Sequence, residues 1–192
     1  MITEQQYKDS AKQLNCEVAA LKAVAEVESG GDGFLKDGQC KILFEPHVFW
    51  KELRKLGIDP STFKGVEDIL YPVWGSKPYG KVSAQHERLD RAILISRDAA
   101  LKSASWGKFQ ILGLNYKLSG FGTVREFVEA MNKNEDEHLK AFVSFIKNTM
   151  LDDELRAKDW KGFARGYNGA LYYKNNYDKK LAASYLKFSG SL

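Results

Sequence analysis

A single glutamate near the N-terminus has the surroundings of a proton donor. Glu28 ends a helical stretch that begins at Cys16, and Ser29-Gly30-Gly31 follows it at once. We expect burial and the negative end of the helix to raise its pKa, which keeps a proton available near neutral pH. The alternative is a side chain that frays into solvent beside the glycines. Four apolar residues share its helical face, at spacings of three and four: Val18, Leu21, Val24 and Ala25.

Two further polar motifs lie much later in the chain. Ser105 and Gln110 flank an apolar run, where they can hydrogen-bond the hydroxyl and amide groups of a ligand, and Gly107 between them permits close backbone approach. Tyr167 and Asn168 supply a phenol and an amide, either of which can orient the acid. Taken singly, each of these residues also has an ordinary structural reading as a helix cap, a surface residue or a core residue.

Helical periodicity dominates the segments that must position these motifs. Thr3 and Gln6 form the pattern of a capping box for a first helix, and Asn15 is a candidate cap for the second. Residues 57–81 hold repeated glycine and proline breaks and predict an irregular excursion. Apolar periodicity and capping signals predict helices over about 4–14, 16–28, 46–56, 83–96, 123–131, 135–150, 159–167 and 176–187.

One stretch predicts β structure. Residues 34–44 contain two short apolar runs around Asp37-Gly38, a pair that favours a tight turn. The sequence therefore predicts a mainly α domain with one small β hairpin directly after the helix that carries the candidate acid.

Composition narrows the class of protein. The chain has 192 residues, 44% hydrophobic and 28% charged, which predicts one globular domain over 1–192. No export signal or long apolar run is evident, so we expect synthesis in the cytoplasm and no stable membrane insertion. Cys16 and Cys40 are expected to be free thiols, and neither metal-site spacing nor a cofactor motif is present. The net charge of +4 is a weak indication of a polyanionic partner.

Three separated pieces resemble the motifs of one superfamily, the goose-type lysozymes and lytic transglycosylases. Glu28-Ser29-Gly30-Gly31 resembles the Glu-Ser motif, whose glutamate is the general acid. Ser105-Trp106-Gly107-Lys108-Phe109-Gln110-Ile111 resembles the second motif, and Gly166-Tyr167-Asn168-Gly169 resembles the third. The three occur in the order of the family. Lys108-Phe109 replaces the usual Leu-Met, which favours a hydrolase mildly, and Gly166 replaces an alanine.

A closer resemblance covers nearly the whole chain. Residues 42–47 together with 103–113 resemble the N-acetylmuramidase domain of bacteriophage endolysins. The resemblance implies an α+β lysozyme-like fold and hydrolysis of the β-1,4 bond between MurNAc and GlcNAc in peptidoglycan. It implies Glu28 as the acid, with Ser105, Gln110, Tyr167 and Asn168 in the glycan site. A phage enzyme of this kind reaches the cell wall after a separate partner permeabilises the membrane, and a monomer is the default expectation.

The second carboxyl group has several candidates. Inverting hydrolysis needs a base that activates water, whereas retention needs a nucleophile closer to the acid. Glu45 is the first candidate, at the end of the expected hairpin, and its structural alternative is an N-cap for the helix at Pro46. Asp37 and Asp32 are weaker candidates, because Asp37 already serves the predicted turn.

Other functions are open from the sequence alone. A lytic transglycosylase would use the same acid but close a 1,6-anhydro ring on the sugar, and a non-catalytic peptidoglycan-binding module would keep only the fold. A nucleic-acid partner is not expected, since no concentrated basic stripe or known motif is present. Several aromatic residues are candidates for stacking on sugar rings: Trp74, Tyr79, Tyr172 and Tyr173. Trp106 is expected to pack beneath the cleft.

Overall fold

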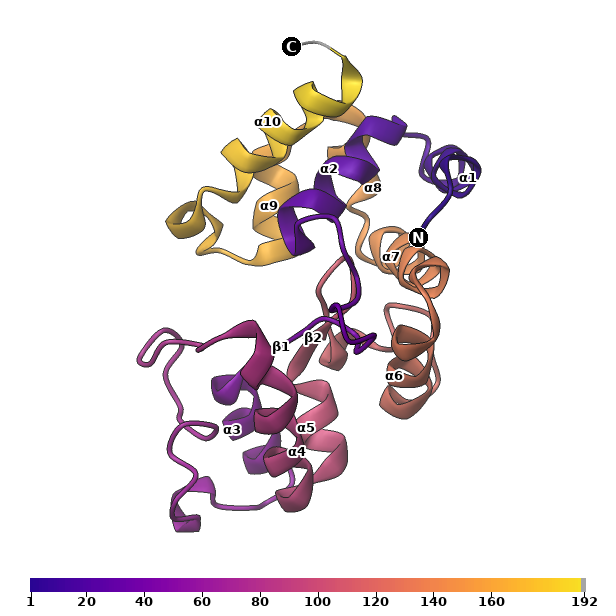
Figure 1. Ribbon diagram of the computed structural model, residues 1–192. Helices are drawn as coiled ribbons and strands as arrows, with labels where there is room; N and C mark the ends of the chain where they lie inside the picture. The colour runs from indigo at the N-terminus through magenta and orange to yellow at the C-terminus, as the bar shows by residue number, and fades with distance from the viewer. Residues whose placement is uncertain (191–192) are drawn as a thin grey trace.

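The computed structural model describes residues 1–190, which form ten α-helices, four short 3-10 helices and a three-stranded sheet (Figure 1). The α-helices are α1 (Glu4–Leu14), α2 (Val18–Ser29), α3 (Pro46–Lys55), α4 (Gln85–Ile95), α5 (Arg97–Lys102), α6 (Val124–Lys133), α7 (Glu135–Thr149), α8 (Asp152–Ala157), α9 (Trp160–Asn168) and α10 (Tyr177–Ser189). The strands are β1 (Ile42–Phe44), β2 (Ala104–Trp106) and β3 (Ile111–Leu112). The 3-10 helices are Pro60–Thr62, Val82–Ala84, Gly113–Asn115 and Tyr172–Asn175. The mainly α, lysozyme-like class that the sequence predicts is confirmed.

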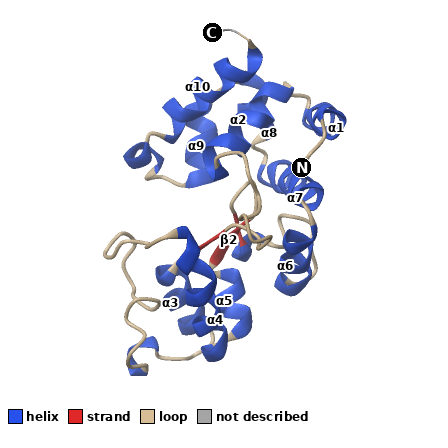
Figure 2. Ribbon diagram, viewed as in Figure 1, coloured by secondary structure: helices blue, strands red, loops and turns tan. Residues whose placement is uncertain are grey.

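The helices form two groups with the sheet between them. Helix α10 packs along α2 and α9, and α1 packs on α2 and α7, which gives one helical group. Helices α3, α4 and α5 pack together in the other group, where α4 also contacts β1 (Figure 1). Helix α6 contacts both α5 and α7 and so joins the two groups. The short strands lie where the groups meet (Figure 2).

The expected hairpin over residues 34–44 is only partly correct. The turn at Asp37-Gly38 forms, but its flanks make a single isolated bridge between Phe34 and Cys40. Strand β1 pairs instead with β2, antiparallel and sixty residues further on, and β2 pairs with β3. The reason is burial: Ile42 and Phe44 lie in the core, and the partner that covers this strand comes from the second motif.

Helix ends agree with the capping signals in two places and differ in one. Thr3 and Thr123 both form capping boxes, at the starts of α1 and α6. Asn15 does not cap α2. It ends α1 instead, in the left-handed conformation with φ of 49°, where asparagine is well tolerated. Helix α8 is an element that the apolar pattern did not predict.

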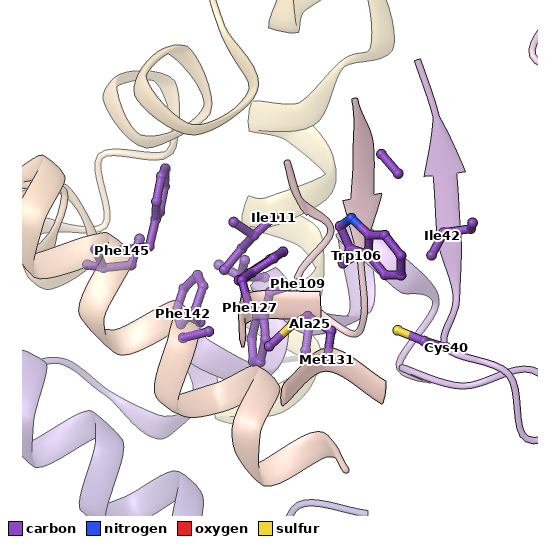
Figure 3. Close-up of a cluster of buried hydrophobic side chains, with 14 of the residues drawn as sticks. Ala25, Cys40, Ile42, Trp106, Phe109, Ile111, Phe127, Met131, Phe142 and Phe145 are labelled. Atoms are coloured by element: carbon purple, nitrogen blue, oxygen red, sulfur yellow. The ribbon is translucent and has the colours of Figure 1, made fainter. Parts of the chain in front are cut away.

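The second motif is anchored in the hydrophobic core. Phe109 stacks on Phe142 of α7 with ring centroids 4.3 Å apart, and both rings are buried (Figure 3). Trp106, the last residue of β2, is buried and donates its indole N–H to the Leu101 carbonyl at 3.2 Å, in keeping with its expected packed position. The buried side chains of Trp106 and Phe109 therefore anchor the turn between β2 and β3 in the core.

Candidate active-site cleft

Glu28 lies in the last turn of α2, in a partly buried position. The helix continues regularly to Ser29 and ends at Gly30 in the left-handed conformation, so the frayed alternative is wrong. Burial raises the pKa of Glu28 to about 7. The Asn168 amide opposes that shift by donating to Oε1 at 2.7 Å, and the charge of Lys180 opposes it further. A carboxyl group with this pKa still holds its proton near neutral pH.

Two lysines stabilise the turn that follows Glu28. Lys41 Nζ donates to the Ser29 carbonyl, and Lys108 Nζ donates to the Gly31 carbonyl. Lys108 also pairs with Glu135 of α7 at 3.0 Å. Positive charges favour a helix C-terminus, because its last carbonyl groups carry partial negative charge. These contacts join the end of α2 to the β2–β3 turn and to α7.

Glu45 faces the same cleft from the start of α3. It occupies the N-cap position but makes no capping hydrogen bond, so the structural alternative is wrong for its side chain. Its carboxylate instead accepts hydrogen bonds from Ser105 Oγ at 3.2 Å and from the Tyr79 hydroxyl at 3.3 Å. Burial raises the pKa of Glu45, while these two hydroxyl groups act in the opposite direction. His47 Nε2 lies 3.7 Å away, and burial lowers the pKa of that imidazole.

The polar residues of the second motif form hydrogen bonds within the protein around the cleft. Ser105 is paired with Leu43 in the sheet, which directs its hydroxyl to Glu45. Gln110 has a φ of 47° and donates its amide to the carbonyl groups of Lys41, at 3.2 Å, and Gly107, at 2.8 Å. Both hydrogens of the Gln110 amide therefore hold the β2–β3 turn in place.

The two polar residues of the third motif, Tyr167 and Asn168, make different contacts. Asn168 contacts Glu28, as expected for a residue that orients the acid. Tyr167 does not: its hydroxyl donates to the Phe109 carbonyl at 2.6 Å, and its ring stacks on Phe163 with centroids 5.2 Å apart. Tyr167 thus joins α9 to the second motif.

Glu28 and Glu45 line the same cleft, which has a volume of about 650 Å³. Residues from both helical groups form its walls. Among the predicted aromatic residues, Trp74, Tyr79 and Tyr172 line it and Tyr173 does not. Within residues 1–190, no three His, Cys, Asp or Glu side chains gather closely enough to hold a metal ion. No helix in that range is long and apolar enough to span a bilayer.

Sequence reasoning missed three contributors to the surroundings of Glu45. Tyr79 was expected only as a stacking aromatic, and its hydroxyl contacts the carboxylate. His47 is a lone histidine without metal-site spacing, so it carries no functional signal in the sequence. Gln85, at the start of α4, was not considered, although it is buried and bonds the backbone next to Glu45. A buried glutamine has no periodic signal of its own, so only the tertiary contacts identify it.

Comparison with known proteins places this arrangement in a family. The model of the N-acetylmuramidase family matches residues 17–189, which include all three motifs. The chain belongs to the N-acetylmuramidase family. Among solved structures, it is similar to the crystal structure of an endolysin from Burkholderia AP3 phage, with 37% identity and a TM-score of 0.84. That alignment covers 98% of this chain and 71% of the endolysin. No curated protein sequence matches the chain.

The departures of this N-acetylmuramidase from the transglycosylase pattern have structural explanations. Lys108 pairs with Glu135 and bonds the turn after α2, and Phe109 packs on Phe142 in the core. Neither side chain lines the cleft, so the Lys-Phe pair serves packing. At Gly166, an added Cβ would lie 2.4 Å from a methyl group of Leu151, so alanine at this position would require the Leu151 side chain to shift.

Proposed function

We propose that this N-acetylmuramidase hydrolyses the β-1,4 bond between MurNAc and GlcNAc in peptidoglycan. The observation that carries the proposal is a pair of carboxyl groups in contrasting surroundings, Glu28 and Glu45, on one cleft. Membership of the family and the similarity to a phage endolysin support peptidoglycan as the substrate. Glycoside hydrolysis needs one group that donates a proton and a second that acts as a carboxylate.

In this proposal Glu28 is the general acid. With a pKa of about 7 a large share of the Glu28 carboxyl groups hold a proton at neutral pH, so Glu28 can donate to the glycosidic oxygen as the bond to the leaving sugar breaks. The Asn168 amide orients the carboxyl group through Oε1. Because burial is the main cause of the raised pKa, a glycan that displaces water from the cleft would hold the proton there more firmly.

Glu45 is proposed as the carboxylate that activates water. The hydroxyl groups of Ser105 and Tyr79 donate to it and stabilise its charged form. A water molecule that loses its proton to Glu45 can add to the sugar carbon while Glu28 protonates the departing oxygen. The charge that develops on the sugar ring is positive, and an ionised Glu45 in the same partly buried cleft would stabilise it.

The remaining motif residues are proposed to form the glycan site around this pair. Ser105 and Asn168 are the polar groups next to the two carboxyl groups. Gln110 and Tyr167 line the cleft, and we propose that they set its shape through the β2–β3 turn. Trp74 and Tyr172 are the aromatic walls on which sugar rings can stack.

We further propose an endolysin role for the protein. The whole of residues 1–192 would act as one catalytic domain, and as a monomer. The protein would be made in the host cytoplasm and would reach the cell wall after the membrane is permeabilised. This part of the proposal rests on the similarity to the AP3 phage endolysin.

Digestion of purified peptidoglycan, followed by mass spectrometry of the unreduced fragments, tests the reaction. We expect products that end in reducing MurNAc. Products lighter by one water, as 1,6-anhydro-MurNAc, would instead establish a lytic transglycosylase in which Glu28 is both acid and base. Binding to the wall with no soluble fragments would establish a non-catalytic module.

Three variants test the residues. Glu28→Gln and Glu45→Gln are each expected to lower kcat by at least about 100-fold, since each removes one half of the acid–base pair. The matched control is Glu26→Gln, because Glu26 lies on the same helix but pairs with Lys187 at 2.6 Å on the surface. Full activity of Glu45→Gln with reducing products would remove Glu45 from the mechanism.

A further inference from the structure

The irregular excursion between α3 and α4 returns to the cleft beside the proposed water-activating carboxylate. Residues 57–81 contain only one short 3-10 helix, Pro60–Thr62, so they make few regular backbone hydrogen bonds. The excursion nevertheless places the Tyr79 hydroxyl 3.3 Å from Glu45 Oε2. Something outside the excursion must therefore hold Tyr79 in position.

Gln85 makes that connection with one buried side-chain amide. Its Oε1 accepts from the Phe44 backbone N–H at 3.0 Å, and Phe44 is the residue next to Glu45. Its Nε2 donates to the Tyr79 carbonyl at 2.7 Å and to the Lys81 carbonyl at 3.0 Å. The side chain is 1% exposed, and both hydrogens of its amide are used. One amide thus joins strand β1, which ends next to Glu45, to the loop that carries Tyr79.

Helix α4 also supports the loop through two arginines, one of which shares the Tyr79 carbonyl with Gln85. Arg88, one turn after Gln85, donates to the Tyr79 carbonyl at 2.5 Å and also to the Asp68 carbonyl. Arg91 pairs with the Asp68 carboxylate through two contacts of 2.8 Å. The hydrogen bonds of these two arginines named here go to the loop and not to β1. Among the three α4 side chains, Gln85 is the one that bonds both the loop and β1.

We propose that Gln85 is a positioning residue that keeps the Tyr79 hydroxyl aligned with Glu45. The inference rests on the proposed role of Glu45 and deepens it. Gln85 acts through Tyr79, which lines the cleft, whereas Gln85 itself does not line it.

The groups around Glu45 determine what a change at Tyr79 or Gln85 would do. Ser105 and Tyr79 donate to its carboxylate, and both bonds favour the charged form. His47 of α3 lies 3.7 Å from the Glu45 carboxylate, and burial lowers the pKa of its imidazole, which disfavours the charged form. Burial, together with the charges of Glu28 and Glu45, raises the pKa of Tyr177 at the start of α10 to about 12.

Loss of the Tyr79 hydrogen bond would raise the pKa of Glu45, because the ionised form would lose a donor. Activity needs Glu45 ionised, so the acidic limb of the kcat/KM profile would move to higher pH. The alkaline limb depends on Glu28 and would stay in place. A purely structural role for Gln85 would lower activity without moving either limb.

A double-mutant cycle tests the inference. Tyr79→Phe and Gln85→Met are each expected to move the acidic limb upward by about 0.5–1 pH unit. The double variant should move it no further than Tyr79→Phe alone, since Gln85 acts through that hydroxyl. Gln13→Met, at an exposed position of α1, is the matched control and should leave the profile unchanged.

A second substitution at the same position, Gln85→Asn, keeps the inference testable if Gln85→Met does not fold. Gln85→Asn keeps a buried amide but is one methylene shorter, so it cannot reach both Phe44 and Tyr79. The same upward movement of the acidic limb is expected. Folding of every variant is checked by circular dichroism before its kinetics are measured.

The outcomes separate this inference from the proposed function. If Glu45→Gln is inactive and Tyr79→Phe moves the limb, but the Gln85 variants do not, the positioning role is overturned and the function stands. Additive shifts in the double variant would also overturn it. An active Glu45→Gln that still releases reducing MurNAc would overturn the role of Glu45 and this inference with it, while the proposed reaction would stand.

Discussion

At the scale of single residues, the two carboxyl groups of the cleft differ in what surrounds the charge. Glu28 is partly buried at a helix end with one amide donor, Asn168, and its pKa is raised to about 7. Glu45 is also buried enough to have a raised pKa, with 18% of its side chain exposed, yet it accepts from two hydroxyl groups. Different environments for two identical groups are how one site obtains both an acid and a base.

The raised pKa of Glu28 predicts a gain in stability when the charge is removed. Below pH 4.5 the carboxyl group is neutral in both states; between 4.5 and 7 the folded protein keeps a proton that the unfolded chain releases, so stability falls as pH rises. Above about pH 7 the ionised carboxyl group lowers the free energy of unfolding by up to about 3 kcal/mol. We therefore expect Glu28→Gln to be more stable than the wild type at pH 8, with little difference at pH 4.

Urea denaturation at the two pH values measures this difference. Glu26→Gln is the control, since Glu26 is more exposed and should show no comparable change between pH 4 and pH 8. An equal effect of Glu28→Gln at both pH values would mean that the carboxyl group carries no such cost.

At the scale of elements, the β2–β3 turn is held around one buried histidine. His138 of α7 accepts from the Lys108 backbone N–H at 3.0 Å through Nδ1, and its Nε2 contacts the Met131 carbonyl at 2.6 Å. Phe34 stacks on its ring with centroids 5.1 Å apart. Gly107 fits against the same ring, where an added Cβ would lie 2.7 Å from ring atoms. The turn that carries the second motif therefore depends on a glycine at this point.

Gly107→Ala is expected to destabilise the protein by about 2–4 kcal/mol, since it adds both a clash with His138 and a side chain at a φ of 73°. Gly57→Ala is the matched control, because Gly57 has a φ of 76° and nothing within 4 Å of the added Cβ. It should cost only about 1–2 kcal/mol. Chemical denaturation compares them, and equal losses would contradict a role for the His138 contact.

At the scale of the whole molecule, the cleft lies between the two helical groups and takes residues from both. Glu28 belongs to α2, which packs under α10, whereas Glu45 begins α3 in the other group (Figure 1). Trp74 from the excursion meets Lys174 from the Tyr172–Asn175 helix, with the ammonium 5.4 Å from the ring centroid. A ligand in the cleft would touch both groups at once and so oppose their separation on unfolding.

A glycan that occupies the cleft is therefore expected to raise the melting temperature of the inactive Glu28→Gln variant. Soluble MurNAc-GlcNAc oligomers at about 100 times Kd should add about 2.7 kcal/mol, because they bind the folded state alone. Differential scanning fluorimetry measures the shift. Trp74→Ala in the same background removes one aromatic wall and should need more ligand for the same shift. No shift at any concentration would contradict binding in this cleft.

The sequence by itself determined most of the helices and the order of the motifs, and it singled out Glu28 as the candidate acid. Apolar side chains at helical spacing place Glu28 beside the core, and capping residues such as Thr3 and Thr123 set helix starts, because both signals depend on neighbours within a few residues. The family resemblance drawn from three local motifs is confirmed in the same way. The roles of Glu28 and Glu45 in catalysis are still proposals.

Only the tertiary structure decided which distant segments meet. The pairing of β1 with β2 replaced the expected hairpin, because burial of Ile42 and Phe44 needs a partner strand from the second motif. The partners of Glu45 come from an irregular excursion and from β2, and Gln85 joins them from α4. Such contacts depend on side chains brought together by packing across the whole chain, and no local spacing encodes them.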